Sequence, residues 1–122
     1  MLRGKVYLLK TCSTCKRILK QVRDFGDFDV RDVKTNPLDI DEIDSLAKRA
    51  GGYELIFNKQ SQKYRQQGLK NKDLSEDDYR QLLSEEYTFL KRPVFLIDDK
   101  IFVGNSNTTV DLLTKYLATT NK

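Results

Sequence analysis

Two cysteines, Cys12 and Cys15, are the residues of this 122-residue chain whose type and spacing best suit chemistry. A thiol reacts as its thiolate, and a free cysteine with a pKa of about 8.5 is only a few per cent ionised at neutral pH. In Cys-x-x-Cys pairs at the start of a helix, the pKa falls to roughly 3.5–7.5. We therefore interpret the pair as redox-active, with Cys12 as the attacking thiolate and Cys15 as the resolving thiol.

The residues around the pair predict a helix start and nearby positive charges that would lower the pKa of Cys12. The apolar run Val6–Leu9 precedes it, and apolar residues then recur at helical spacing up to Phe25. Cys12 is therefore expected at the start of a helix, where unpaired backbone N–H groups and the helix dipole favour an anion. Lys16 and Arg17 add positive charge within one turn.

Three other roles for the cysteines need weighing. A zinc site needs four Cys or His ligands, and the chain has no histidine and no third cysteine, so only a dimer sharing four thiolates would suffice. A static disulfide across so short a loop would add little stability. Two buried, inert thiols are the remaining alternative, and the polar neighbours Ser13, Thr14 and Lys16 count against it. The motif favours redox chemistry and no metal site.

Composition bounds the other functions. The chain has 22 Lys and Arg against 18 Asp and Glu, a net charge of +4, which favours anionic small molecules or acidic protein surfaces. No dense basic run with interleaved aromatic residues indicates nucleic-acid binding. No signal peptide and no run of about 18 apolar residues is visible, so we expect a monomeric cytoplasmic protein that does not bind membranes. Without histidine, proton transfer falls to water, lysines, carboxylates or the thiols.

The first 33 residues predict a β-α-β unit. A strand at Val6–Leu9 is followed by a helix that Gly26 ends, and Phe28–Val33 alternates as a half-buried strand does. Parallel strands joined by a right-handed crossover place the loop after the first strand at the carboxyl edge of the sheet. Cys12 is expected at that edge.

The remainder predicts a helical insertion and a hairpin. From about Pro37 to Leu90 no strand is indicated, and we expect helical pieces that pack beside the sheet within a single domain, 1–122. The helix and turn signals in this insertion are capping boxes at Asp39/Glu42 and Ser75/Asp78, a helix end at Gly51-Gly52, helical pieces at Tyr53–Phe57 and near Tyr64 up to Gly68, and a polar turn at Asn71–Asp73. Strands at Arg92–Ile97 and Ile101–Val103 form a hairpin that completes a four-stranded mixed sheet, and a final helix follows Ser106 or Asn107.

Cys12-Ser13-Thr14-Cys15 follows the first predicted strand, Arg92-Pro93-Val94 stands at the head of the third, and Tyr64–Leu69 forms a segment of the insertion. With these features the sequence resembles the arsenate reductase (ArsC) and Spx family of the thioredoxin-like fold. The resemblance covers nearly the whole chain. It implies an α/β, thioredoxin-like (glutaredoxin-type) fold.

The resemblance also implies roles for single residues. Cys12 would be the nucleophile, and Pro93 the cis-proline set beside the active thiol. Arg92 would bind an oxyanion or stabilise the thiolate, which its fork of donors suits. Thr14 and Lys16 complete the expected substrate-binding set.

The chain also departs from the family pattern. Arsenate reductases carry an arginine before the tyrosine of the insertion and another after the final hairpin, whereas this chain has Phe57–Ser61 and Val103–Asn105 there, with Lys59 as a partial substitute. We therefore expect weak arsenate reduction. Cys15 matches the Spx branch, and Gly51-Gly52 lies near the region that those regulators use to touch RNA polymerase.

Two main hypotheses follow. The first is a thiol–disulfide oxidoreductase with no bound cofactor, acting on a small thiol or disulfide substrate, with glutathione or a thioredoxin or glutaredoxin as reductant. The alternative is an Spx-like redox-sensing regulator that binds RNA polymerase. A true arsenate reductase, and a degenerate member whose thiols no longer turn over, are further alternatives.

Overall fold

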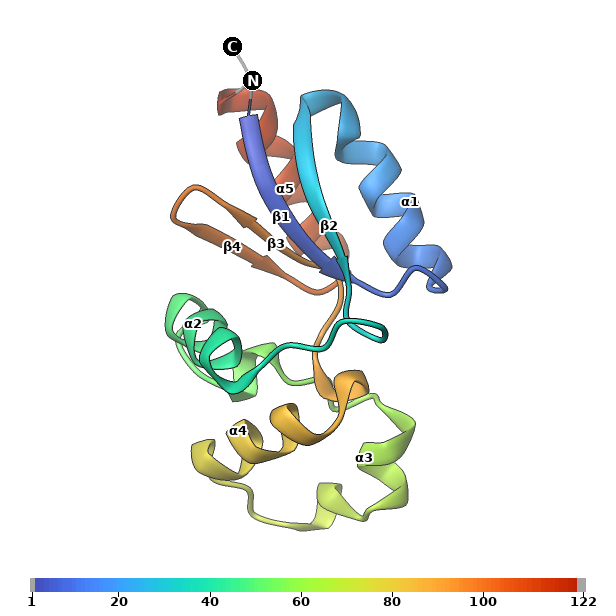
Figure 1. The fold of residues 1–122 in the computed structure, drawn as a ribbon, viewed down its shortest axis with the longest axis vertical. Helices are drawn as coiled ribbons and strands as arrows, with labels where there is room; N and C mark the ends of the chain where they lie inside the picture. The colour runs from blue at the N-terminus through green and yellow to red at the C-terminus, as the bar shows by residue number, and fades with distance from the viewer. Residues whose placement is uncertain (1, 121–122) are drawn as a thin grey trace. The chain divides into compact units, whose positions relative to one another are not determined.

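The computed structural model describes the backbone of residues 2–120 and the side chains of 4–119. The chain forms two compact units (Figure 1): a sheet unit, Met1–Asn36 with Arg92–Lys122, and an insert unit, Pro37–Lys91. The insert unit covers almost the same residues as the helical insertion expected from the sequence. No helix within the described residues has the length and apolar character needed to cross a membrane.

The sheet unit holds one mixed four-stranded sheet in the order β2-β1-β3-β4. β1 and β2 run parallel, and β3 is antiparallel to both β1 and β4. The α/β architecture expected from the sequence is confirmed. The elements are β1 Leu2–Leu8, α1 Ser13–Val22, η1 Arg23–Phe25, β2 Gly26–Asp32, β3 Val94–Ile97, β4 Lys100–Val103 and α5 Asn107–Thr120.

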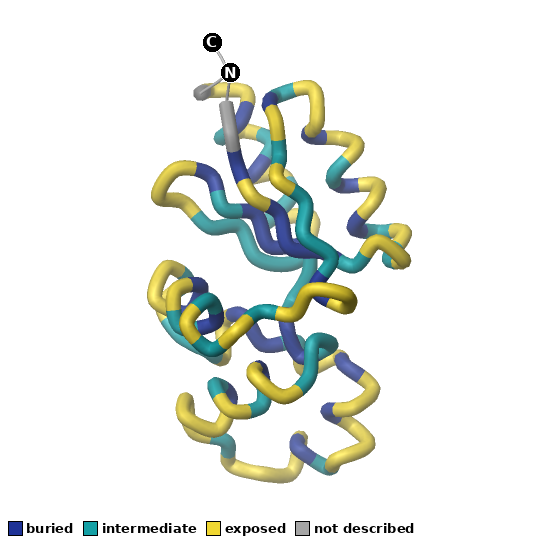
Figure 2. The backbone as a smooth tube through the Cα atoms, in the orientation of Figure 1, coloured by how far each residue is buried: buried dark blue, intermediate teal, exposed yellow. Residues whose placement is uncertain are grey.

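The core of this unit lies between the sheet and the helices α1 and α5. Alternation along β1 directs Val6 and Leu8 to this side. Cys15 is part of the same core, whereas most residues on the outer side of α1 are exposed (Figure 2). The buried cluster consists of Val6, Leu8, Cys15, Ile18, Val22, Phe95, Ile97, Leu113 and Leu117.

The prediction that Gly26 ends the first helix was wrong. α1 ends at Val22, and a single 3-10 turn, Arg23–Phe25, leads into β2. Gly26 has a φ of 169°, which is extended backbone, and is the first residue of β2, paired with Leu2. The parallel ladder therefore starts earlier on both strands than their apolar runs suggested.

Gly4 lets the polar start of β1 lie close to both neighbouring strands. A Cβ at Gly4 would lie 3.0 Å from the Leu96 carbonyl oxygen and 3.2 Å from Cδ1 of Phe28. Glycine therefore lets β1 fit between its two neighbours, a packing constraint that hydrophobic periodicity does not reveal.

The insert unit is helical, as expected, and both capping boxes are present. Asp39 and Glu42 close the start of α2, and Ser75 and Asp78 close the start of α4. Gly51 ends α2 with a φ of 100°, a left-handed conformation that glycine adopts without strain. The elements are α2 Ile40–Ala50, η2 Glu54–Ile56, α3 Gln62–Gln66, η3 Leu69–Asn71, α4 Glu76–Glu85 and η4 Tyr87–Phe89. The polar turn expected at Asn71–Asp73 begins instead as the 3-10 turn η3.

An aromatic cluster and an ionic contact between two helices help to hold the insert unit together. Phe57 packs against Tyr64, Tyr79 and Phe89, with ring centroids 5.8, 4.9 and 5.0 Å away. Between α2 and α4, Arg80 donates two hydrogen bonds to the Asp44 carboxylate, at 2.8 and 3.1 Å. These bonds, with one from the Tyr53 hydroxyl, lower the pKa of Asp44 to about 2.

The second glycine of the Gly51-Gly52 pair has a separate role. The backbone N–H groups of Tyr53 and Glu54 donate to the Glu76 carboxylate, at 2.8 and 3.1 Å. A Cβ at Gly52 would lie only 2.8 Å from Oε1 of Glu76. Glycine at this position therefore leaves room for a contact that joins the start of α4 to the loop after α2.

Replacing Gly52 by alanine should lower the free energy of unfolding by about 1 kcal/mol, because the methyl group displaces a carboxylate that accepts two hydrogen bonds. Glu76→Ala should cost a similar amount. Because both changes act on the same contact, the double variant should be less destabilised than the sum of the two. Urea unfolding of the four proteins measures this, and strictly additive effects would contradict it.

Candidate active site

Cys12 is the N-cap residue of α1, with φ −85° and ψ 113°. Its N–H donates to the Leu9 carbonyl at 3.0 Å, and its carbonyl accepts from the N–H of Lys16 at 3.1 Å. The tight turn after β1 and the first helical turn thus hold the Cys12 backbone from both sides. Its side chain is half-buried, Cys15 is 1% exposed, and both are free thiols.

The environment of Cys12 favours the thiolate. Partial burial opposes ionisation, but the backbone N–H and thiol of Cys15, the Thr14 backbone N–H and the Arg92 charge together outweigh it, so the pKa of Cys12 lies below its ordinary value. The side chain makes no cap hydrogen bond of ordinary geometry. The sulfur therefore stays available to a substrate while the helix start stabilises its charge.

The environment of Cys15 favours the protonated thiol. Burial raises the pKa of Cys15 to about 11, and its hydrogen bond to Cys12 and the Cys12 charge act in the same direction. The Leu9 backbone and the Arg92 charge act against this shift without overcoming it. Two thiols within one helical turn are thus shifted in opposite directions.

Arg92 and Pro93 lie in the same unit as the thiols. The Arg92–Pro93 peptide bond is cis, the geometry that the resemblance implied, and the Pro93 carbonyl accepts from Gly104 N–H at 2.9 Å. The Nη1 atom of Arg92 is buried and has no hydrogen-bond partner. Its charge is one of the causes that lower the pKa of Cys12.

Thr14 affects the Cys12 pKa, whereas no such effect is found for Lys16. Thr14 contributes through its backbone N–H, which lowers the pKa of Cys12. The Lys16 side chain is exposed on α1, and the charged side chain that lowers the Cys12 pKa is Arg92. Substrate binding by Lys16 stays a prediction.

Lys59 does not offer the free charge that the sequence suggested. Its ammonium group is ion-paired with Glu54 and lies 5.7 Å from the centre of the Tyr79 ring, both within the insert unit. These contacts use the charge that would have replaced a missing arginine. Among the described residues, no three His, Cys, Asp or Glu side chains come together in a way that could hold a metal ion.

Sequence reasoning missed one hollow on the sheet unit. A cavity of about 380 Å³ over β1 and β2 is lined by cations, among them Lys5 and Lys10, and by the acids Asp29 and Asp32. Arg31 also lines it, donating to the Asn36 carbonyl at 2.9 Å. From the sequence, the alternating charges of β2 indicated only the polar face of a half-buried strand. Those charges, which line the cavity, were the feature of the sequence that could have indicated it.

Comparison with known proteins assigns the family. The model of the ArsC family matches residues 7–112, which include both cysteines and Arg92-Pro93. The chain belongs to the ArsC family. This ArsC-family chain is 30% identical to a structure described as a possible arsenate reductase from Streptococcus mutans UA159, with a TM-score of 0.75 over 93% of this chain and 99% of that one.

Two curated relatives are similar over comparable lengths. An uncharacterized protein of Haemophilus influenzae is 30% identical over 81% of this chain and 88% of its own length. The global transcriptional regulator Spx of Lactiplantibacillus plantarum is 26% identical over 81% of this chain and 76% of its own length. The ArsC-family protein is therefore similar both to a protein described as a possible arsenate reductase and to one described as an Spx regulator.

Iodoacetamide should alkylate Cys12 far faster than Cys15 at neutral pH, because Cys12 is the more exposed thiol and its pKa is lowered whereas that of Cys15 is raised. The pH midpoint of the Cys12 rate should lie below that of a free thiol, and Arg92→Ala should move it upward by removing a stabilising charge. Site-resolved mass spectrometry measures both rates. Equal rates for the two cysteines would contradict the assignment.

The Cys15 thiol should make stability depend on alkaline pH. Because its pKa is raised in the folded state, its contribution is present below the unfolded pKa of about 8.5 and is lost as pH rises towards 11. Relative to Cys15→Ala, the wild type should lose roughly 2–3 kcal/mol of unfolding free energy across this window. Urea unfolding of both proteins from pH 8 to 11 measures the difference, and a constant difference would refute it.

Proposed function

We propose that this ArsC-family protein is a thiol–disulfide oxidoreductase in which Cys12 is the nucleophile and Cys15 the resolving thiol. The observation that carries the proposal is the opposite shift of the two pKa values, lowered at Cys12 and raised at Cys15. An attacking thiol must be ionised at neutral pH, whereas a resolving thiol should stay protonated until it is needed.

The electrostatics of the pair support a two-step reaction. The Cys12 thiolate attacks one sulfur of a substrate disulfide, which forms a mixed disulfide and releases the other half as a thiolate. Cys12 then carries no charge, so one cause of the raised Cys15 pKa is gone. Cys15 loses its proton and attacks Sγ of Cys12, releasing the second half of the substrate, which takes up a proton. Two electrons pass from the cysteine pair to the substrate, leaving a Cys12–Cys15 disulfide.

The substrate class follows from the charges at the site. The unused Nη1 donor of Arg92 suits a negatively charged group, such as a carboxylate of glutathione or of a glutathione mixed disulfide. The Thr14 backbone and the Lys16 side chain are proposed to assist in binding it. Glutathione, or a thioredoxin or glutaredoxin, would return the disulfide to two thiols, and the reaction is proposed for the cytoplasm.

A second candidate function is Spx-like regulation through RNA polymerase. The similarity to Spx favours it, as does the Cys12–Cys15 pair, which the resemblance implies for the Spx branch. However, Gly52, the residue that suggested a partner surface, makes room for Glu76 within the insert unit. That contact accounts for the glycine without a partner, which is why we rank the reductase first.

Arsenate reduction is the least supported activity for this chain. Both arginines that serve the oxyanion in arsenate reductases are absent, and Lys59 is paired with Glu54. Relatives described as arsenate reductases share the fold, and only the general thiol chemistry is carried over to this proposal.

The decisive test is reduction of hydroxyethyl disulfide by glutathione, coupled to glutathione reductase and NADPH. We expect turnover above free glutathione, its loss in Cys12→Ser, and a trapped mixed disulfide in Cys15→Ser because the resolving thiol is missing. Ser13→Ala, which alters an exposed neighbour, should remain active. Arsenate in place of the disulfide should give little turnover.

Capture of RNA polymerase from the native host distinguishes a regulator from a reductase. Gly52→Arg should not affect disulfide turnover, and Gly52→Ala is the matched control because its methyl group already displaces Glu76. Capture by wild type and Gly52→Ala but not by Gly52→Arg, together with no turnover above free glutathione, would overturn the reductase proposal in favour of the regulator.

A further inference from the structure

The outer side of α1 and the following 3-10 turn carries exposed cations. The exposed positions include Lys16, Arg17 and Lys20 on α1 and Arg23 at the start of η1, while Ile18 and Val22 of the same helix are buried. No acidic residue occurs between Ser13 and Val22. Within the described residues, no ion pair neutralises any of these four cations.

The cations align with the nucleophile. Residues four apart lie on the same side of a helix, so Lys16 and Lys20 continue the line that starts at Cys12, and Arg23 is close to it. The first intrahelical bond, from Lys16 N–H to the Cys12 carbonyl, fixes this register. We call Lys16, Arg17, Lys20 and Arg23 the basic ridge. It begins one helical turn after Cys12.

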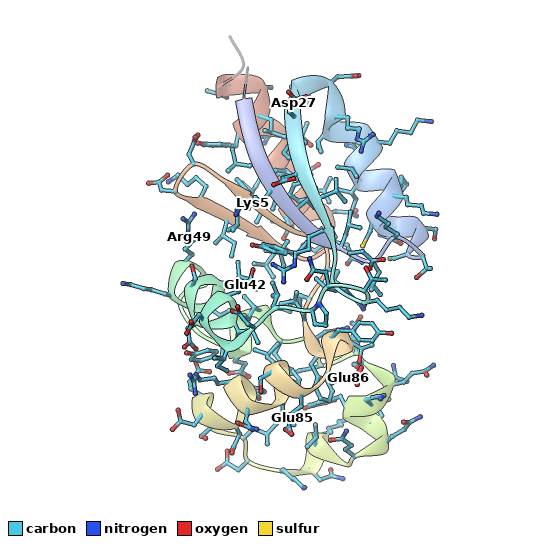
Figure 3. The ribbon with its side chains drawn as sticks, in the orientation of Figure 1. Lys5, Asp27, Glu42, Arg49, Glu85 and Glu86 are labelled. Atoms are coloured by element: carbon cyan, nitrogen blue, oxygen red, sulfur yellow. The ribbon has the colours of Figure 1, made fainter. Side chains whose placement is uncertain are left out.

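Charge is divided unevenly between the two units of the chain. The sheet unit holds 13 Lys and Arg against 7 Asp and Glu, and the insert unit 9 against 11, which together account for the 22 and 18 of the whole chain. The nearest acids in sequence, Asp24 and Asp27, follow the ridge. Asp27 lies near the start of β2, at the opposite end of the parallel strand pair from the Cys12 loop (Figure 3).

We propose that the basic ridge docks a protein whose disulfide is surrounded by acidic side chains, and that this docking delivers the disulfide to Cys12. The inference rests on the proposed function and names its substrate class. The ridge extends about 10 Å from Lys16 to Arg23 at the helical rise, longer than a small disulfide needs. A nucleic acid is less favoured because no aromatic side chain stands among the exposed positions of α1.

Cys12 and Cys15 together supply both electrons that reduce the partner's disulfide. The Cys12 thiolate attacks the partner's disulfide, one partner sulfur leaves as a thiolate, and Cys15 releases the other by forming the Cys12–Cys15 disulfide. The partner gains two electrons and ends with two thiols. The ridge takes no part in bond exchange, so its contribution should appear in the rate of encounter and in the dependence of that rate on salt.

The test uses two synthetic peptides of equal length, each with one cysteine in a mixed disulfide with 2-thiopyridine. In one peptide the cysteine is flanked by four glutamates, and in the other by four glutamines. Release of thiopyridone measures the second-order rate constant of reaction with Cys12. At low salt the acidic peptide should react at least about tenfold faster, and near 1 M salt, where the screening length is about 3 Å, the two rates should converge.

Matched variants locate the effect on the ridge. Lys20→Glu/Arg23→Glu should abolish or reverse the preference, whereas Lys100→Glu/Lys115→Glu, with the same change in net charge at exposed positions of the same unit, should keep most of it. Thermal melts verify folding. If the ridge variant does not fold, Lys20→Gln/Arg23→Gln, which removes the charges without reversing them, should reduce the preference and takes its place.

The possible outcomes distinguish a failure of the docking proposal from a failure of the oxidoreductase proposal. No thiopyridone release from either peptide would mean that the oxidoreductase proposal itself fails. Release at equal rates from both peptides would overturn the docking surface and leave the oxidoreductase standing. Binding of a short DNA duplex that the ridge variant loses, with no peptide preference, would assign the ridge to nucleic acid and would also overturn the proposal.

Discussion

The proposed chemistry depends on two thiols held within the first turn of one helix, the first with a lowered pKa and the second with a raised one. Cys12 and Cys15 are separated by two residues, yet one is half-buried and favours the charged form while the other is 1% exposed and favours the neutral form. Neighbouring thiols cannot both ionise cheaply, because each charge raises the pKa of the other. The fold decides which one carries the charge.

Position in the fold makes that choice. Cys15 lies in the core with Ile18, where a charge would lose its hydration. Cys12, at the N-cap, meets free backbone N–H groups and the Arg92 charge. The order of attack and resolution in the proposed reaction is therefore a consequence of where α1 begins. Moving that start by one residue would place a different side chain at the N-cap.

Much of this arrangement could be predicted from the sequence. The Cys-x-x-Cys spacing, the capping boxes and the polar start of α1 are local signals, and they placed Cys12 at the helix start. The cis bond before Pro93 and the approach of Arg92 came from family resemblance, since no local pattern brings residue 92 to residue 12. The cis bond is present in the structure, and the Arg92 charge is one cause of the lowered Cys12 pKa.

The misses share a physical cause. Gly26 was expected to end a helix because glycine often does, but pairing with Leu2 made it the first residue of a strand. The contact of Glu76 with the loop after Gly52 joins residues more than 20 positions apart, and the Lys59–Glu54 pair depends on how η2 turns. The sequence did indicate that Cys15, one turn inside the helix, is more sheltered than Cys12, and its packing in the core raises its pKa.

The most direct test of the account is a pH titration of the reduced protein with ¹³Cβ-labelled cysteine, followed by NMR. The chemical shift of each Cβ reports the ionisation of its own sulfur, so the two thiols are observed separately in one sample. We predict two steps, with Cys12 ionising below the ordinary value of a thiol and Cys15 ionising near pH 11. Ionisation of Cys15 before Cys12, or of both together near the ordinary value, would contradict the central claim.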